Sequence, residues 1–350
     1  MTFSVRAGLA ALFALSLLAD APLPAQAGAC TLDDADREWI QGALDDWDHA
    51  SREILRLEAR PLPWMVFIDT ACAWHVAPDA RGDADLAATL ALAGAPLRFQ
   101  GGTAEVRGVA HGGEVRLPGG QRVPAVPLSF AAPYGDAGAA FFVMGMPAVW
   151  KRDPRHAADP GLAWLIRAVF VHEMTHTRQV GSVDRRIDAL AARVPDPESL
   201  NDDVIQTRFD SVPGFRAAID AERDLLYRAA AEPDPARRRA LAAQALAGAR
   251  ERRARWFAGA DGVYAELEDV FLGMEGAAQW AAYKVALRHA GPDADPATVL
   301  TRFRRGGTFW SQDYGMALFL TLDVLLPDWQ ARTFAAEPAS VFALLQEAVR

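Results

Sequence analysis

The segment 170–177 reads FVHEMTHT and holds two histidines four residues apart, His172 and His176. Upstream of it, apolar residues recur at helical spacing: Leu162, Leu165, Ile166, Val169 and Phe170. This periodicity predicts one long amphipathic helix. Residues i and i+4 share one face of a helix, so both imidazoles can reach the same point in space.

Two histidines in this register suit a metal ion, and Glu173 beside the first can take a proton from a metal-bound water. Zinc fits this chemistry because three protein ligands leave a fourth position open for that water. The alternative is a pair of structural histidines, since short motifs arise by chance. Asp159 as N-cap and Pro160 at the first helical position strengthen the helix prediction and favour the metal site.

The chain has 350 residues, of which 51% are hydrophobic, so one or two domains with a sizeable core are expected. Its net charge of -9 argues against a nucleic-acid partner held by phosphate contacts. Arginine supplies nearly all the positive charge, because Lys151 and Lys284 are the only lysines. The arginine-rich stretches 237–239 and 250–255 are expected to form an ion-paired, solvated helix face rather than a membrane-binding surface.

Residues 1–27 have the pattern of a signal peptide: Arg6, an apolar run over 7–19 and a small-x-small site at 25–27. That run is too short to span a bilayer and no later segment qualifies, so no transmembrane segment is expected. We therefore predict a mature chain that starts near Gly28 and is periplasmic or secreted.

Export permits a disulfide, and Cys30 and Cys72 are the two cysteines. A bridge would tie the mature N-terminus to the first strand region. The alternative is lipidation of Cys30. Ala27 is a poor residue for that signal, and the polar stretch 20–26 separates it from the apolar run, so the bridge is favoured.

Residues 28–150 are predicted to form a helix over 31–58, with a capping box at Thr31 and Asp34, and then a small β region. Strands are expected at 64–68 and 139–150, with a hairpin of 114–117 and 123–130 around a Gly-Gly turn. Pro147 indicates that the 139–150 strand is an edge or ends there. An exposed edge strand before the histidine helix could accept a peptide by strand addition.

Three residues, Asp69, Trp74 and His75, are expected where the first strand gives way to a loop, a common place for functional groups. The alternative is a supporting Asp and a packed Trp-His pair. Beyond the histidine helix, long helices are predicted over 215–231, 235–256 and 264–290, with a final helix from Pro338.

A catalytic zinc needs a third protein ligand. The glycine and third histidine of the metzincin pattern are absent, because Gln179 and Ser182 occupy those positions. Glu275 is the favoured candidate, since a carboxylate among apolar and small residues is costly unless it is paired or metal-bound. Gln279, one turn later, could orient a ligand. Glu268 and Asp313 stay open as alternative ligands.

These motifs resemble the gluzincin metallopeptidases, the group that includes thermolysin and aminopeptidase N. His172, Glu173 and His176 match the His-Glu-x-x-His motif, and Glu275 matches the Glu-Gly-x-Ala segment of the aminopeptidase branch. The resemblance implies that His172, His176 and Glu275 bind Zn2+ and that Glu173 is the general base. Tyr314, in the segment WSQDYGMAL, resembles the oxyanion-stabilising tyrosine of that branch.

The resemblance covers about half the chain, from residue 139 onwards. The interval between His176 and Glu275 is longer than in typical members and implies an inserted helical region. Residues 145–148 lack the Glu and Asn of the aminopeptidase Gly-x-Met-Glu-Asn strand, which grips a substrate amino terminus. An endopeptidase, or a peptidase of narrow specificity, therefore fits better than an aminopeptidase.

We predict an α+β protein: a signal peptide (1–27), an N-terminal helix with a small, mainly antiparallel sheet (28–150), and a mostly helical zincin-like catalytic region (151–350). The predicted function is hydrolysis of peptide or protein substrates. One alternative is an exported binding or scaffold protein on a peptidase-like fold, although a non-catalytic metal site would not need Glu173. The other is a zinc amidohydrolase that acts on cell-wall material.

Overall fold

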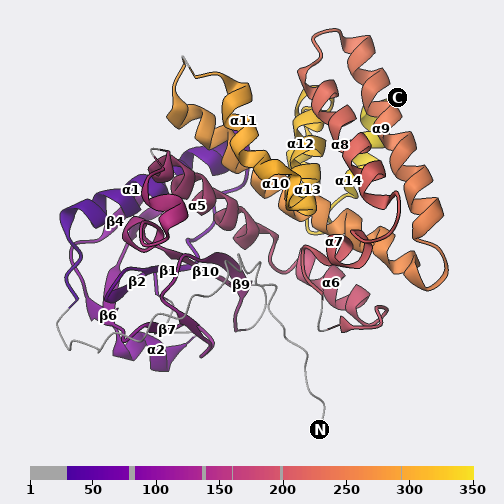
Figure 1. Cartoon of the computed structure of the whole chain (residues 1–350). Helices are drawn as coiled ribbons and strands as arrows, with labels where there is room; N and C mark the ends of the chain where they lie inside the picture. Colours follow the sequence, from indigo (N-terminus) through magenta and orange to yellow (C-terminus); the bar gives the residue numbers. More distant parts are fainter. Residues whose placement is uncertain (1–29, 79–82, 136–138, 160, 198–199, 293) are drawn as a thin grey trace. The chain divides into compact units, whose positions relative to one another are not determined.

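The computed structural model describes residues 30–78, 83–135, 139–159, 161–197, 200–292 and 294–350 (Figure 1). The predicted signal peptide and Pro160 lie outside these residues. The chain divides into two compact units, Met1–Gly181 and Ser182–Arg350. The first holds the β-sheets and the second is helical, which confirms the α+β prediction. The division falls after the histidine helix rather than near residue 150, because that helix packs on the sheet of the first unit.

A six-stranded sheet forms the centre of the first unit. Its order is β3 (Ala91–Leu92), β6 (Val106–Ala110), β2 (Cys72–Val76), β1 (Trp64–Ile68), β10 (Ala140–Gly145) and β9 (Ser129–Pro133). The pair β1 and β10 is parallel, and the other neighbours are antiparallel. Two small hairpins accompany it: β4 (Leu97–Phe99) with β5 (Gly102–Ala104), and β7 (Glu114–Arg116) with β8 (Arg122–Pro124).

The edge strand nearest the histidine helix is β9. The strand predicted over 139–150 is β10, which lies inside the sheet between β1 and β9. Pro147 marks the end of that strand, where it opens the short helix α3 (Pro147–Trp150). The predicted strand over 123–130 splits between β8 and β9. Strand order depends on pairing with distant segments, so the local pattern around Pro147 did not identify the edge.

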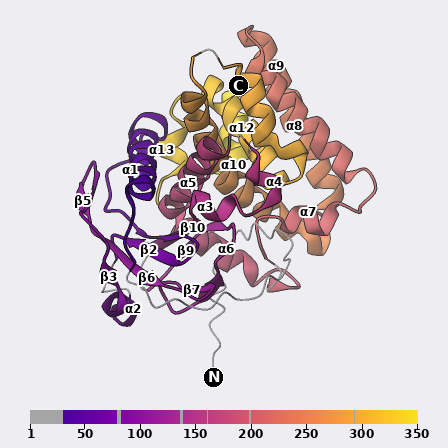
Figure 2. The same ribbon diagram turned by 60° about the vertical axis from the view of Figure 1, so that its left-hand side comes forward.

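Helices cover one face of this sheet (Figures 1 and 2). They are α1 (Asp34–His49), its continuation η1 (Ala50–Ile54), a π-helix, and α5 (Leu162–Gln179). Asp33, not Thr31, caps α1, since its carboxylate accepts from the Asp36 amide at 2.8 Å. The opposite face carries a separate apolar core with α2 (Ala84–Thr89) and the β7–β8 hairpin. The remaining helix of this unit is α4 (Pro154–Ala157).

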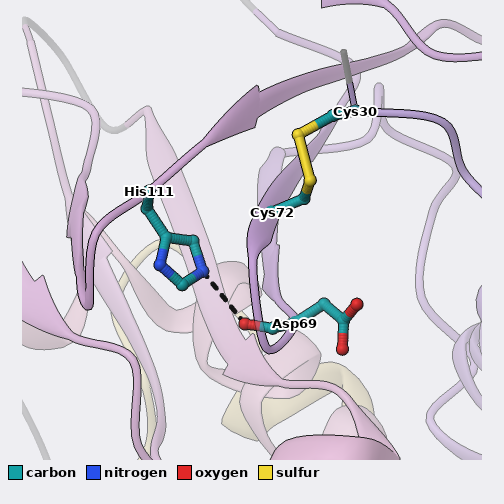
Figure 3. The surroundings of a disulfide bond; sticks show 4 residues. All are labelled: Cys30, Asp69, Cys72 and His111. Atoms are coloured by element: carbon teal, nitrogen blue, oxygen red, sulfur yellow. Dashed lines mark hydrogen bonds between the residues drawn. A yellow bond between two sulfur atoms is a disulfide. The ribbon is translucent and has the colours of Figure 1, made fainter. Parts of the chain in front are cut away.

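A disulfide joins Cys30 to Cys72 at the start of β2 (Figure 3). The Cα atoms are 6.0 Å apart, and the bridge closes a loop over a sequence separation of 42. Nearby, the Nε2 of His111 donates to the carbonyl of Asp69 at 3.0 Å. The predicted bridge is confirmed. A bridged cysteine offers no thiol to a lipid, so the bridged form excludes lipidation at Cys30.

Trp74 and His75 lie within β2, so the loop predicted there was wrong, and His75 packs against Trp64 rather than against Trp74. His75 is fully buried, and its Nδ1 accepts a hydrogen bond from the Trp64 indole at 3.0 Å. Burial lowers the pKa of His75 to about 3. His75 is therefore a neutral structural residue of the sheet.

This burial predicts an acid-sensitive fold. Below a pH of about 6.5 the unfolded chain binds a proton at His75 that the folded chain refuses until a pH of about 3. The free energy of unfolding should therefore fall as the pH drops through this window. The fall should be steeper in the parent than in His75→Gln, by about 1.4 kcal/mol per pH unit. Urea unfolding at several pH values measures this. His289→Gln, at an exposed histidine, should follow the parent, and parallel curves for His75→Gln would contradict the prediction.

The second unit is a helical assembly. Its long helices are α8 (Phe215–Ala231), α9 (Pro235–Trp256), α10 (Val263–Ala290) and α12 (Trp310–Leu325). The first three agree closely with the predicted spans. The shorter ones are α6 (Val183–Ala191), α7 (Val204–Phe209), η3 (Gly259–Gly262), α11 (Pro296–Arg304), η4 (Arg305–Gly307), α13 (Trp329–Thr333) and α14 (Val341–Ala348). In the described part of the chain, no helix is long and apolar enough to cross a membrane.

The helices α10 and α12 meet backbone to backbone. A Cβ on Gly276 would lie 2.4 Å from the carbonyl carbon of Gly315, and a Cβ on Gly315 would lie 2.6 Å from the Cα of Gly276. Neither position can hold a larger residue without separating the helices. The small residue after Glu275 therefore serves the α10–α12 contact, and this contact fixes the course of the helix that carries Glu275.

Candidate metal centre

The histidine helix α5 is held on the sheet by aromatic packing. Phe170 stacks on Phe67 of β1 at 6.0 Å and meets Phe142 of β10 edge-on at 5.2 Å. The N-cap position is Gly161, whose amide donates to the carboxylate of Asp159 at 2.8 Å. Phe170 and the sheet thus fix the position of the next turn of α5, which carries the motif.

His172 and His176 point to a common position. Their Nε2 atoms are 3.0 Å apart, and both side chains are nearly buried. The Nδ1 of His176 donates to the amide oxygen of Gln179 at 2.8 Å. An amide oxygen can only accept, so the proton sits on Nδ1 and the Nε2 of His176 keeps its lone pair.

This geometry fits a tetrahedral zinc ion. With Zn–N bonds of about 2.0–2.1 Å, two imidazole nitrogens in such a site lie about 3.3 Å apart, close to the separation in the structure. Gln179 supplies the partner that orients a metal-binding imidazole and fixes its tautomer. The pair therefore has the spacing and the chemistry of two ligands of one metal.

Glu173 is fully buried next to this pair. Its Oε1 accepts a hydrogen bond from the hydroxyl of Ser129 at 2.9 Å, and Ser129 is itself buried at the start of β9. The helix and the edge strand thus meet at these two side chains. Ser129 was not predicted as a site residue. Leu128, Phe130 and Ala132 alternate with Ser129 and face the opposite apolar core. This alternation could have predicted that Ser129 faces the helix, but not that it contacts Glu173.

Glu275 lies in the second unit, fully buried on α10. The Gln279 side chain, one turn later, donates to the carbonyl of Phe303 at 3.1 Å. Asp203 is a further acidic group that the sequence did not single out. Burial and the nearby charge of Glu275 raise the pKa of Asp203 to about 6, against the opposing charge of Arg305. Glu275 is therefore a buried carboxyl group with a second carboxyl group nearby.

The two alternative ligands are held by arginines. Glu268 pairs with Arg252 and Arg253, each at 2.7 Å. Burial alone would raise the pKa of Glu268, but these two cations lower it. A metal would have to break this buried network to use Glu268, at a cost of several kcal/mol.

Asp313 is bound in the same way. Its carboxylate accepts from the hydroxyl of Tyr227 at 2.6 Å and pairs with Arg223 and Arg304 at 3.2 and 3.3 Å. Burial raises the pKa of Asp313, opposed by Tyr227 and both arginines. Because its carboxylate already makes these contacts, Asp313 is disfavoured as the third ligand.

Tyr314 is fully buried on α12 and donates to Glu222 at 2.8 Å. Glu222 in turn pairs with the buried Arg252 of the arginine-rich helix α9 at 2.9 Å. The arginine-rich face of α9 is solvated at Arg237, Arg239, Arg250 and Arg255, as predicted, whereas the ion pairs of Arg252 are buried. Burial and the charge of Glu222 raise the pKa of Tyr314 well above its ordinary value. The oxyanion role of Tyr314 stays a prediction, and it would require the phenol to leave Glu222.

Comparisons with protein-family models, curated proteins and solved structures find no match to this chain. The resemblance to gluzincins therefore rests on the motif residues.

Proposed function

We propose that this chain is an exported zinc metallopeptidase with His172, His176 and Glu275 as metal ligands and Glu173 as general base. The observation that carries the proposal is the histidine pair, with Nε2 atoms 3.0 Å apart and Glu173 buried beside them. Two structural histidines could share a hydrogen bond at this Nε2 distance, but they would not need an adjacent buried carboxylate held by its own donor.

Each residue has a defined task. The imidazoles of His172 and His176 bind through Nε2, and Gln179 keeps the second ring in the required tautomer. When bound, zinc supplies Lewis acidity that polarises the scissile carbonyl and makes a bound water a nucleophile near neutral pH. Ser129 holds Oε1 of Glu173, and the carboxylate of Glu173 would accept the proton of the attacking water.

Glu275 completes the proposed ligand set. His172, His176 and Glu275 offer three donor atoms of the kinds that hold zinc. The ion pairs of Glu268 and Asp313 within the second unit favour Glu275 by elimination.

The proposed substrate is a peptide or an extended protein segment. The edge strand β9 packs against α5 and contacts Glu173 through Ser129, so a peptide added to β9 would run past the base. The disulfide and the N-terminal signal pattern support export, because disulfides persist in oxidising compartments.

The test starts with zinc per mature chain by elemental analysis, followed by digestion of dye-labelled casein and of peptidoglycan fragments. We expect one zinc per chain and casein hydrolysis that a chelator abolishes and added zinc restores. Cleavage of peptidoglycan alone would replace the peptidase with an amidohydrolase. Zinc without hydrolysis of either substrate would favour the binding or scaffold alternative, and no zinc after metal is added back would refute the metal site.

A further inference from the structure

Ser129 lies on the edge strand β9, and its side chain and its backbone groups point in different directions. Its hydroxyl donates to Glu173 of the histidine helix. Both side chains are buried, so water does not compete for this hydrogen bond.

The ladder between β9 and β10 shows where the backbone of Ser129 points. The carbonyl of Leu128 accepts from the amide of Gly145 at 2.9 Å, and the amide of Tyr134 donates to the carbonyl of Ala139 at 3.0 Å. In an antiparallel pair, successive residues direct their N–H and C=O groups alternately toward and away from the neighbouring strand. The backbone groups of Ser129 and Ala131 therefore point away from β10, to the outer edge.

The same residue thus touches the base and lines the outer edge. We propose that Ser129 is a positioning residue that fixes the carboxylate of the general base Glu173 against the edge strand β9. Its hydroxyl holds Oε1 of Glu173 in a buried hydrogen bond. This inference rests on the proposed peptidase function.

The test compares Ser129→Ala with Ser129→Thr, which retains the hydroxyl. We expect kcat on dye-labelled casein to fall by about tenfold or more in Ser129→Ala, because a misplaced base is inefficient, with KM within about twofold and zinc unchanged. Ser129→Thr should recover most of kcat. Thr321→Val is the matched control. This variant removes a buried hydroxyl that donates a hydrogen bond within the second unit, and it should keep the parental kcat.

A metal-free measurement tests the link itself. In a double-mutant cycle of Ser129→Ala and Glu173→Ala, the shifts in melting temperature should be non-additive. Additive shifts, or parental kcat in Ser129→Ala, would overturn the role of Ser129 while the peptidase proposal stands. A parent chain that binds zinc but leaves casein intact would overturn the peptidase proposal, and the positioning role with it. The metal-free cycle would then still establish whether the Ser129–Glu173 bond forms.

Discussion

Replacing Glu173 with glutamine is expected to lower casein hydrolysis by about a hundredfold to ten-thousandfold while zinc stays bound. Glutamine keeps the shape of the side chain, and its amide oxygen can still accept from the Ser129 hydroxyl. It cannot take a proton from the attacking water. The change therefore removes general-base chemistry and leaves the histidine ligands in place. The measurements are kcat/KM and zinc per chain on the same preparations.

The control for this replacement is Glu251→Gln, the same chemical change at an exposed position of α9. It should retain parental activity and zinc. Activity within tenfold of the parent in Glu173→Gln would remove Glu173 from the mechanism. Loss of zinc together with activity would show instead that Glu173 maintains the metal site rather than the chemistry.

The elements predicted best are those that local signals define. The spans 215–231 and 235–256 agree with α8 and α9 to the residue. Apolar periodicity sets their length, and the start of α9 has a local cap, because the Asp234 side chain accepts from the Arg237 amide. The start of α1 was displaced by a few residues, since Thr31 and Asp33 are both good caps and the sequence does not rank them.

Such local signals do not determine the order of the strands in the sheet. β10 pairs in parallel with β1 on one side and antiparallel with β9 on the other. Its continuous apolar run is typical of a strand buried on both faces, yet nothing in the run itself names its neighbours. Locating the edge at β9 required the tertiary pairing, and the position of Ser129 depends on it.

The same distinction applies to the candidate site, where some contacts follow from local spacing and others from tertiary packing. The helical repeat alone brings His172 and His176 to one face, so this pair could be predicted from four residues of spacing. The Ser129–Glu173 bond joins residues 44 apart through the packing of α5 on β9. The burial of Glu268 against Arg252 likewise depends on how α9 and α10 pack, which sequence spacing does not specify.

Replacing Glu275 with glutamine is expected to weaken zinc binding by about a hundredfold or more. Loss of a residue that only orients a ligand already costs about 10- to 100-fold in metal affinity, and loss of the ligand charge itself should cost at least as much. Glutamine preserves the volume on α10 but not the anionic donor. Zinc per chain after dialysis against a competing chelator measures the effect, with circular dichroism of the metal-free protein to establish folding.

Glu268→Gln and Asp313→Asn are the matched variants, because each removes one buried acidic charge from the same unit. They break ion pairs with Arg252, Arg253, Arg223 and Arg304 and should lower stability by about 3–5 kcal/mol, yet retain zinc. Zinc lost in one of them and kept in Glu275→Gln would reassign the third ligand. Zinc lost only in Glu275→Gln would support Glu275 as the third ligand.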